Sequence, residues 1–164
     1  KTDSALEKLT AFNPDVRIQA HPFRLDDKNA GPLAASYDLV LAAVDNREAR
    51  RVINRACYGC GVPWIDGGVD GFFGMVSVYR PPAGPCYECL TRGVPELTGH
   101  VPMLLGAQPG TVGLLQVQEA FKLILGIGKP LAGRVLFYDA REPRFDIVEV
   151  PADPVCPVCR GSTA

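Results

Sequence analysis

The sequence contains no apolar run near the ~20 residues that a membrane-spanning helix needs, and its first residues form no signal-peptide pattern. It has no excess of charge of either sign, because 17 Lys and Arg oppose 18 Asp and Glu, and its longest basic run is the pair Arg50-Arg51. Nucleic-acid binding requires many cations against phosphates. We therefore expect a soluble, cytoplasmic protein with no nucleic-acid and no membrane partner.

The Gly-rich fingerprint G-x-G-x-x-G, which cradles the phosphates of dinucleotides, is also missing. The nearest approach, Gly126-Ile-Gly128, follows a predicted helix instead of a strand. This absence leaves nothing in favour of a nicotinamide-dependent oxidoreductase. The length of 164 residues and an apolar content of 47% fit one packed domain over residues 1–164.

Hydrophobic periodicity predicts an α/β fold. Residues 38–44 are apolar after Asp38, which is typical of a buried parallel strand, and with the helix and strand that follow they form a βαβ unit. We expect a Rossmann-like, mostly parallel sheet with helices on both faces and C-terminal antiparallel strands. The predicted helices cover 2–12, 46–60 and 110–126, and the predicted strands cover 16–20, 38–44, 62–65, 75–80, 135–138 and 145–150.

Six cysteines form three pairs of identical C-x-x-C spacing. Two of these pairs, Cys86/Cys89 and Cys156/Cys159, lie in Pro- and Gly-flanked loops, and two such knuckles supply the four thiolates of a structural zinc site. Free buried thiols and a redox disulfide are the alternatives. The third pair, Cys57 and Cys60, falls on the last turn of a predicted helix, where small buried helix residues are the simpler interpretation.

An acid and an amide, Asp45 and Asn46, follow the predicted strand 38–44 directly. Ligands of parallel sheets bind beyond the carboxyl ends of the strands, so a carboxylate here can hold Mg²⁺ against a nucleotide phosphate. Asp and Asn are also preferred helix caps, and capping alone explains their position equally well.

Several motifs, in this order, resemble the ThiF/MoeB-type adenylyltransferases, relatives of ubiquitin-activating enzymes that charge sulfur carrier proteins. The resemblance covers nearly the whole chain. Its motifs are Lys1 before a helix ending in Asn13-Pro14, Tyr37-Asp-Leu-Val-Leu-Ala-Ala-Val-Asp45-Asn46 with Arg50 and Asn54, Gly61-Val-Pro-Trp, Gly71-Phe-Phe-Gly-Met, Gly84-Pro-Cys-Tyr-Glu-Cys-Leu90, Gly113-Leu-Leu-Gln-Val-Gln-Glu-Ala-Phe-Lys122 and Cys-Pro-Val-Cys159.

This resemblance implies adenylation, in which the C-terminal glycine (Gly-Gly) carboxylate of a ubiquitin-fold sulfur carrier protein attacks the α-phosphate of ATP. By the family pattern, Lys1 would contact the ATP phosphates, Asp45 would act catalytically and hold Mg²⁺, and Asn46 would complete the nucleotide pocket. Arg50 matches a family position too, although a salt bridge on a solvated helix explains it equally well. The four loop cysteines would be the family's zinc ligands.

The sequence departs from the family pattern in two places. The N-terminal segment with the Gly-rich nucleotide loop does not precede Lys1, so residues 1–164 correspond to the C-terminal two-thirds of the family's domain, and we expect this chain alone to bind ATP poorly. Where ThiF-like members often carry an acceptor cysteine, this chain has Gly99, which favours adenylation without a thioester step. The alternative function is a noncatalytic, zinc-stapled binding or dimerisation module.

The predicted helix 110–126 has more apolar surface than one core face needs. Members of the family usually work as dimers, so a homodimer interface on this helix is expected, with burial inside its own domain as the alternative. The apolar positions are Val112, Leu114, Leu115, Val117, Phe121, Leu123, Ile124 and Leu125.

Overall fold

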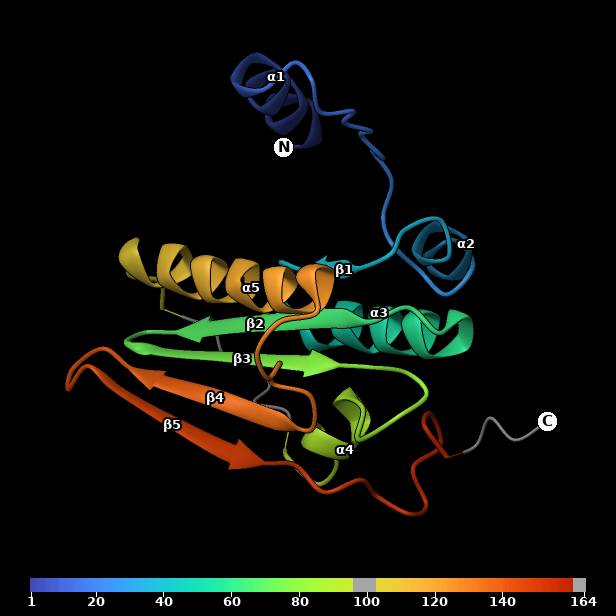
Figure 1. Ribbon diagram of the computed structural model, residues 1–164, viewed down its shortest axis with the longest axis vertical. Coiled ribbons are helices and arrows are strands. Elements are labelled where there is room, and N and C mark those ends of the chain that lie inside the picture. The colour runs from blue at the N-terminus through green and yellow to red at the C-terminus, as the bar shows by residue number, and fades with distance from the viewer. Residues whose placement is uncertain (96–102, 161–164) are drawn as a thin grey trace.

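The computed structural model describes residues 1–95 and 103–160, in which five helices and five strands are found (Figure 1). The helices are α1 (Thr2–Phe12), α2 (Ala30–Ala34), α3 (Arg47–Cys60), α4 (Tyr87–Thr91) and α5 (Ala107–Leu125). The strands are β1 (Val40–Ala42), β2 (Trp64–Asp70), β3 (Phe73–Tyr79), β4 (Arg134–Asp139) and β5 (Arg144–Glu149). No helix among these residues is long and apolar enough to cross a membrane.

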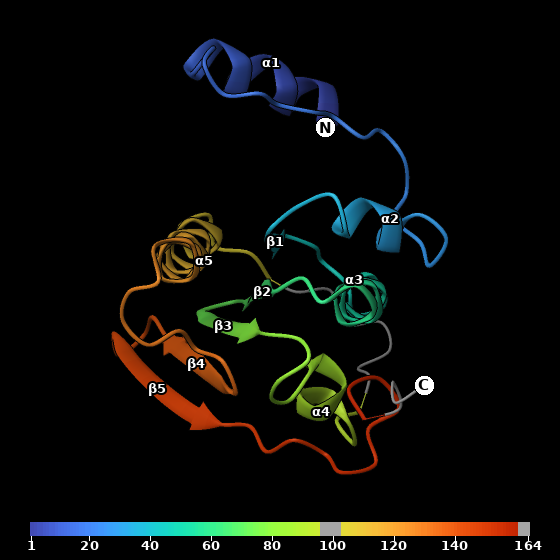
Figure 2. The same cartoon turned by 45° about the vertical axis from the view of Figure 1, so that its right-hand side comes forward.

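The five strands form one sheet in the order β1-β2-β3-β4-β5, with α5 on one face and α3 and α4 on the other (Figures 1 and 2). The prediction of helices on both faces and of C-terminal antiparallel strands is confirmed. The prediction of a mostly parallel sheet is wrong, because only β1 and β2 pair in parallel and the other three pairs are antiparallel. Strands β2 and β3 form a hairpin through the glycine-rich stretch 68–74, which turns at Gly71, whose φ of 57° favours glycine.

Two predicted strands change in the structure. Residues 16–20 alternate apolar with polar but form no strand, since an alternating segment needs a neighbour to take its backbone hydrogen bonds and none of the described strands pairs with it. The strand predicted over 38–44 is three residues long and lies at the edge of the sheet, with Leu41 44% exposed. It is therefore the parallel strand that was predicted, but it is not fully buried.

The core consists of two clusters, one on each face of the sheet. Under α3 and α4, Trp64 of β2 stacks on Tyr79 of β3, with ring centroids 4.4 Å apart, and Tyr87 of α4 closes the group. Under α5, Ile65 and Val78 pack against the helix. These two layers hold the β1–α3–β2 unit, and thus the carboxyl ends of β1 and β2, in place.

Gly74 of β3 allows α5 to approach the sheet closely. A Cβ at this position would lie 2.6 Å from Cγ2 of the buried Val112. Because Val112 is stiff at χ1 and has no room to move, we expect Gly74→Ala to lower the free energy of unfolding by about 1–3 kcal/mol. Gly59→Ala in α3 is the matched control: no heavy atom lies within 4 Å of its added Cβ, so it should raise stability by about 0.5–1 kcal/mol. Urea denaturation measures both, and equal effects would contradict this packing.

Candidate metal centre and candidate active site

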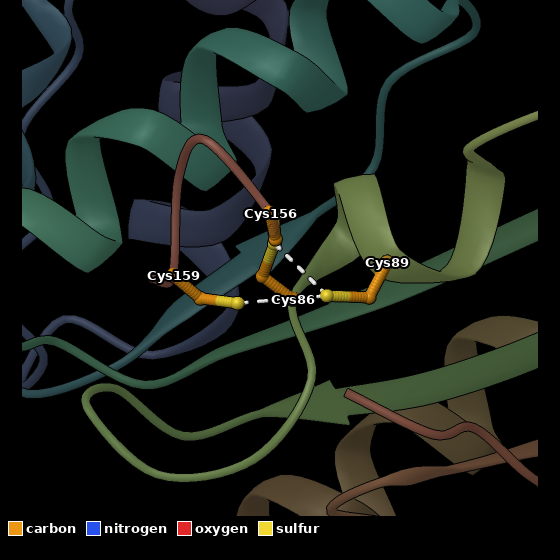
Figure 3. Close-up of side chains that lie close together, drawn as sticks. All are labelled: Cys86, Cys89, Cys156 and Cys159. Carbon is orange, nitrogen blue, oxygen red and sulfur yellow. Dashed lines mark hydrogen bonds between the residues drawn. The ribbon is translucent and has the colours of Figure 1, made fainter. Parts of the chain in front are cut away.

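The four loop cysteines lie close together, two of them at the start of α4 and two in the C-terminal loop (Figure 3). Their sulfur atoms all lie within 4.8 Å of one another. The Sγ atoms of Cys86 and Cys156 are 3.5 Å apart, those of Cys89 and Cys159 are 3.5 Å apart, and those of Cys86 and Cys89 are 3.9 Å apart. The structure thus brings together two pairs that are 66 residues apart in the sequence.

This sulfur arrangement fits a tetrahedral zinc ion. Zn–S bonds of about 2.3 Å place neighbouring sulfur atoms about 3.8 Å apart, whereas a disulfide requires about 2.0 Å. All four cysteines are free, and their spacing matches the first value. Within residues 1–95 and 103–160, this is the single group of three or more Cys, His, Asp or Glu side chains that could hold a metal.

Local structure positions the two knuckles. Cys86 is the residue before α4, so the first turn of that helix carries Cys89 back toward it. The backbone N–H of Asp153 donates to the Cys89 sulfur at 3.4 Å, and Arg92 forms an ion pair with the Asp153 carboxylate. Hydrogen bonds of this kind stabilise thiolate sulfur and orient it, so the second knuckle is fixed to the first by contacts other than the metal.

Helix α3 is joined to the first knuckle by two hydrogen bonds. The fully buried Asn54 accepts from the backbone N–H of Tyr87 at 3.1 Å, and the Tyr58 hydroxyl donates to the carbonyl of Pro85 at 3.0 Å. Asn54 and Tyr58 lie one turn apart on the same helix face. The candidate metal centre and the C-terminal half of α3 are therefore parts of one packed unit.

Cys57 and Cys60 stand apart from the four clustered sulfur atoms. Cys57 is completely buried in the core, and this burial raises the pKa of its thiol to about 12. A thiol so far from ionising is unreactive at neutral pH. Its environment agrees with the interpretation of Cys57 as a small core residue.

Asp45 and Asn46 lie between the end of β1 and the start of α3. The Asn46 side chain caps α3 by accepting from the N–H of Ala49 at 2.8 Å, and its amide donates to Asp45 at 2.9 Å. The helix-cap interpretation thus holds for Asn46. The Asp45 carboxylate does not cap the helix; it is held by Asn46 and projects from the strand end.

Lys1 lies near this pair. It is the exposed residue before α1, and its charge acts on Asp45. The hydrogen bond from Asn46, together with the charges of Lys1 and Arg50, lowers the pKa of Asp45 below its ordinary value. We call Lys1, Asp45 and Asn46 the strand-end site. It combines an ionised carboxylate, a cation and an amide at the place where parallel sheets bind their ligands.

The sequence left Arg50 open between a family position and a salt bridge on a solvated helix, and it did not single out Asp66. In the structure Arg50 points inward, and its Nε donates to the Asp66 carboxylate at 2.8 Å, with the two side chains 13% and 1% exposed. Burial raises the pKa of Asp66, while Arg50 opposes that rise. An acid inside the otherwise apolar Trp64–Ile65–Asp66 segment was the signal that pointed to a buried partner.

Comparison with known proteins decides the family. A model of the ThiF family matches residues 1–158. The chain belongs to the ThiF family. This result confirms the resemblance drawn from the sequence motifs.

Curated relatives of this ThiF-family chain are adenylyltransferases. The sulfur carrier protein adenylyltransferase of Thermus thermophilus is 42% identical over 94% of this chain and 60% of its own length. The SAMP-activating enzyme E1 of Haloferax volcanii is 40% identical over 97% and 60%, and the molybdopterin-synthase adenylyltransferase of Escherichia coli is 35% identical over 97% and 65%. The chain thus spans about three-fifths of the length of these relatives.

Solved structures share the fold. The Escherichia coli MccB structure determined with ATP matches with a TM-score of 0.82 at 17% identity, covering 96% of this chain and 50% of that one. MccB determined with MccA-N7isoASN matches with a TM-score of 0.84 at 18% identity, covering 96% and 51%. Gly99, the position compared with the family's acceptor cysteine, lies outside the described residues.

Proposed function

We propose that this ThiF-family chain takes part in the ATP-dependent adenylation of the C-terminal glycine of a ubiquitin-fold sulfur carrier protein ending in Gly-Gly. The strand-end site supports this proposal, because the Asn46 amide holds the Asp45 carboxylate just beyond the end of β1 and the charge of Lys1 acts on that carboxylate. These are the charges that a Mg²⁺–nucleotide complex requires. The names of the relatives supply the substrate class.

The residues of the site have distinct tasks in this reaction. ATP supplies the activated α-phosphorus, and Mg²⁺ screens the phosphate charge. Asp45, kept ionised by its neighbours, would bind the Mg²⁺, and Lys1 would offset the negative charge that grows on the departing pyrophosphate. Asn46 holds the Asp45 carboxylate in a fixed direction through its own helix-capping bond. Positioning and charge compensation account for most of such catalysis.

Adenylation is the whole of the proposed chemistry. The sequence has no cysteine between Cys89 and Cys156, so the segment after the first knuckle offers no thiol to accept the activated carrier. We assign the four clustered cysteines to a structural zinc ion, because four thiolates leave no open position for a substrate.

Carrier-dependent ATP–pyrophosphate exchange, measured on a protein that joins this chain to the family's N-terminal Gly-rich nucleotide segment, tests the proposed function. Exchange that requires both Mg²⁺ and a carrier protein ending in Gly-Gly would support it. A protein that binds the carrier but shows no exchange would instead be the noncatalytic binding module.

We also propose a homodimer that contacts through α5. This helix turns polar side chains inward: Gln116 donates to the Ala42 carbonyl at 2.9 Å, and Glu119 accepts from the Leu131 N–H at 2.8 Å. Val112 and Ala120 pack in the core, but other apolar side chains of the helix point outward. Leu114, Phe121 and Ile124 are 66%, 55% and 68% exposed. Such a face suits a second copy of the chain.

Phe121→Glu should therefore convert a dimer into a monomer, because it places a charge at the centre of the outward face of α5. Sedimentation equilibrium measures the change. Phe137→Glu, at a 44% exposed position of β4, is the matched control and should leave the dimer intact. A wild-type protein that is monomeric at high concentration would show that α5 is no dimer interface.

A further inference from the structure

Arg50 is held by two protein contacts in the middle of β2, beside the last residue of β1. It projects from the second turn of α3, its Nε donates to Asp66 at 2.8 Å, and its Nη2 donates to the carbonyl of Gly67 at 2.9 Å. A Cβ at Gly68 would lie 3.6 Å from Nη2 and 3.1 Å from Cγ of Met75, so the absence of a side chain at Gly68 leaves the guanidinium its space. The direction of Arg50 is thus fixed by the backbone of β2 as well as by its acid.

Asp66 has one carboxylate oxygen that is not hydrogen-bonded in the described part of the chain. Its second oxygen, Oδ2, is buried and has no hydrogen-bond partner among the described residues. A buried carboxylate with one bare oxygen destabilises the fold, and an apolar pair would stabilise it better. Fold stability therefore does not explain why Arg50 and Asp66 are paired. A functional role of the positioned Arg50 side chain does explain it.

The third guanidinium nitrogen, Nη1, is left over. Nothing in residues 1–95 and 103–160 bonds to it, and 13% of the Arg50 side chain stays exposed. Arg50 also lies near enough to Asp45 for its charge to act on that carboxylate. The guanidinium lies beside Asp66, which pairs with Ala42 at the end of β1, three residues before Asp45. A donor group with no partner among the residues described is therefore available next to the strand-end site.

We propose that Arg50 binds the terminal carboxylate of the peptide that is activated, and that Asp66 is a positioning residue that aims Arg50 at it. This inference rests on the proposed function. In the reaction a carboxylate oxygen forms a bond to the α-phosphorus, the bond from that phosphorus to the bridging oxygen breaks, and the electron pair leaves with pyrophosphate.

The negative charge of Asp66 serves this task. An arginine without a counter-charge would bind the carboxylate strongly and withdraw electron density from the attacking oxygen. Paired with Asp66, the same guanidinium orients the carboxylate through directional hydrogen bonds at small net charge. The peptide carboxylate is thus oriented, and its attacking oxygen stays nucleophilic.

A peptide titration tests the inference on the 164-residue chain. The probe is a synthetic hexapeptide ending in Gly-Gly with a free carboxylate, and its C-terminal amide is the ligand control; chemical shifts in NMR spectra report binding. Arg50→Gln should weaken binding of the free acid about tenfold or more and leave binding of the amide unchanged. Arg55→Gln is the matched protein control, since Arg55 also lies on α3 but pairs with Asp27, which precedes α2. This variant should affect the binding of neither ligand.

Two variants of Asp66 separate its position from its charge. Asp66→Asn keeps an acceptor for Arg50 and removes the repelling charge, so the free acid should bind about three- to tenfold more tightly. Asp66→Ala removes the acceptor, so binding should weaken relative to Asp66→Asn. A purely structural role would shift the affinities of acid and amide together.

Three results would overturn the inference. The wild-type protein could bind the free acid and the amide with equal affinity, or Arg50→Gln could bind the free acid as tightly as wild type does. Alternatively, Arg50→Gln could lose affinity for ATP while its affinity for the peptide is unchanged. In each case carrier-dependent pyrophosphate exchange can persist, and the proposed function then stands without this role for Arg50. If the wild-type protein binds the peptide as expected but shows no carrier-dependent pyrophosphate exchange, only the proposed function is refuted.

Discussion

In a protein that also carries the family's N-terminal Gly-rich nucleotide segment, Asp45→Ala should lower the rate of carrier-dependent ATP–pyrophosphate exchange by about a hundredfold or more. This is the size of effect seen when a group that stabilises transition-state charge is removed. The Asp45 carboxylate is ionised at neutral pH, because Asn46, Lys1 and Arg50 lower its pKa. It contacts no core residue and caps no helix, so its loss should not disturb folding. The carrier should still bind.

The control for this prediction is Asp15→Ala, which removes another exposed carboxylate far from the end of β1. It should exchange pyrophosphate at the wild-type rate. Asp45→Asn keeps the size and polarity of the side chain and should be nearly as inactive as alanine, since charge is the required property. Undiminished exchange in either Asp45 variant would show that this carboxylate has no catalytic part.

Cys156→Ser should abolish zinc binding and destabilise the protein. The wild-type chain should carry about one zinc ion, measured by atomic absorption, and the variant should carry none. Because metal binding by four thiolates is coupled to folding, we expect a loss of about 3 kcal/mol or more, or roughly 10 °C in melting temperature. A chelator should bring wild type to the same state.

Cys60→Ser is the matched control, because this thiol is half-buried and lies outside the group of four. It should keep its zinc and lose little stability. The effect of Cys156→Ser should also reach the C-terminal half of α3, since Asn54 and Tyr58 tie that part of the helix to the first knuckle. A metal-free Cys156→Ser protein as stable as wild type would refute a structural zinc site.

Local chemistry made part of this structure predictable. Two C-x-x-C pairs in one domain are typical of a structural zinc site, so the group of four cysteines was predictable from their spacing. The ends of α3 were predictable from the capping preferences of Asn46 and of Gly61, whose φ is 75°. The direction of β2 and β3 did not follow, because Gly67 and Gly68 lie inside a strand although glycine usually interrupts one. Gly67 is needed there, since a Cβ would lie 2.5 Å from Cδ of Gln116.

The Arg50–Asp66 pair could not be predicted for a different reason. The residues are 16 positions apart, and pairing them requires knowing which face of α3 lies on β2. The four arginines at 47, 50, 51 and 55 read as a solvated face, yet Arg50 alone of them is placed beneath the strand ends and bonded to Asp66. Charge patterns identify helix surfaces only statistically.

Helix α1 has no buried residue, and this has a consequence for the lysine that precedes it. An 11-residue helix with no packed face is marginal on its own, so its amide protons should exchange with solvent far sooner than those of α3 or α5. Lys1, whose charge acts on Asp45, therefore directly precedes a helix that has no buried residue. Immobilising that cation carries an entropic cost that falls on the binding step, so nucleotide affinity should depend on how firmly α1 is held.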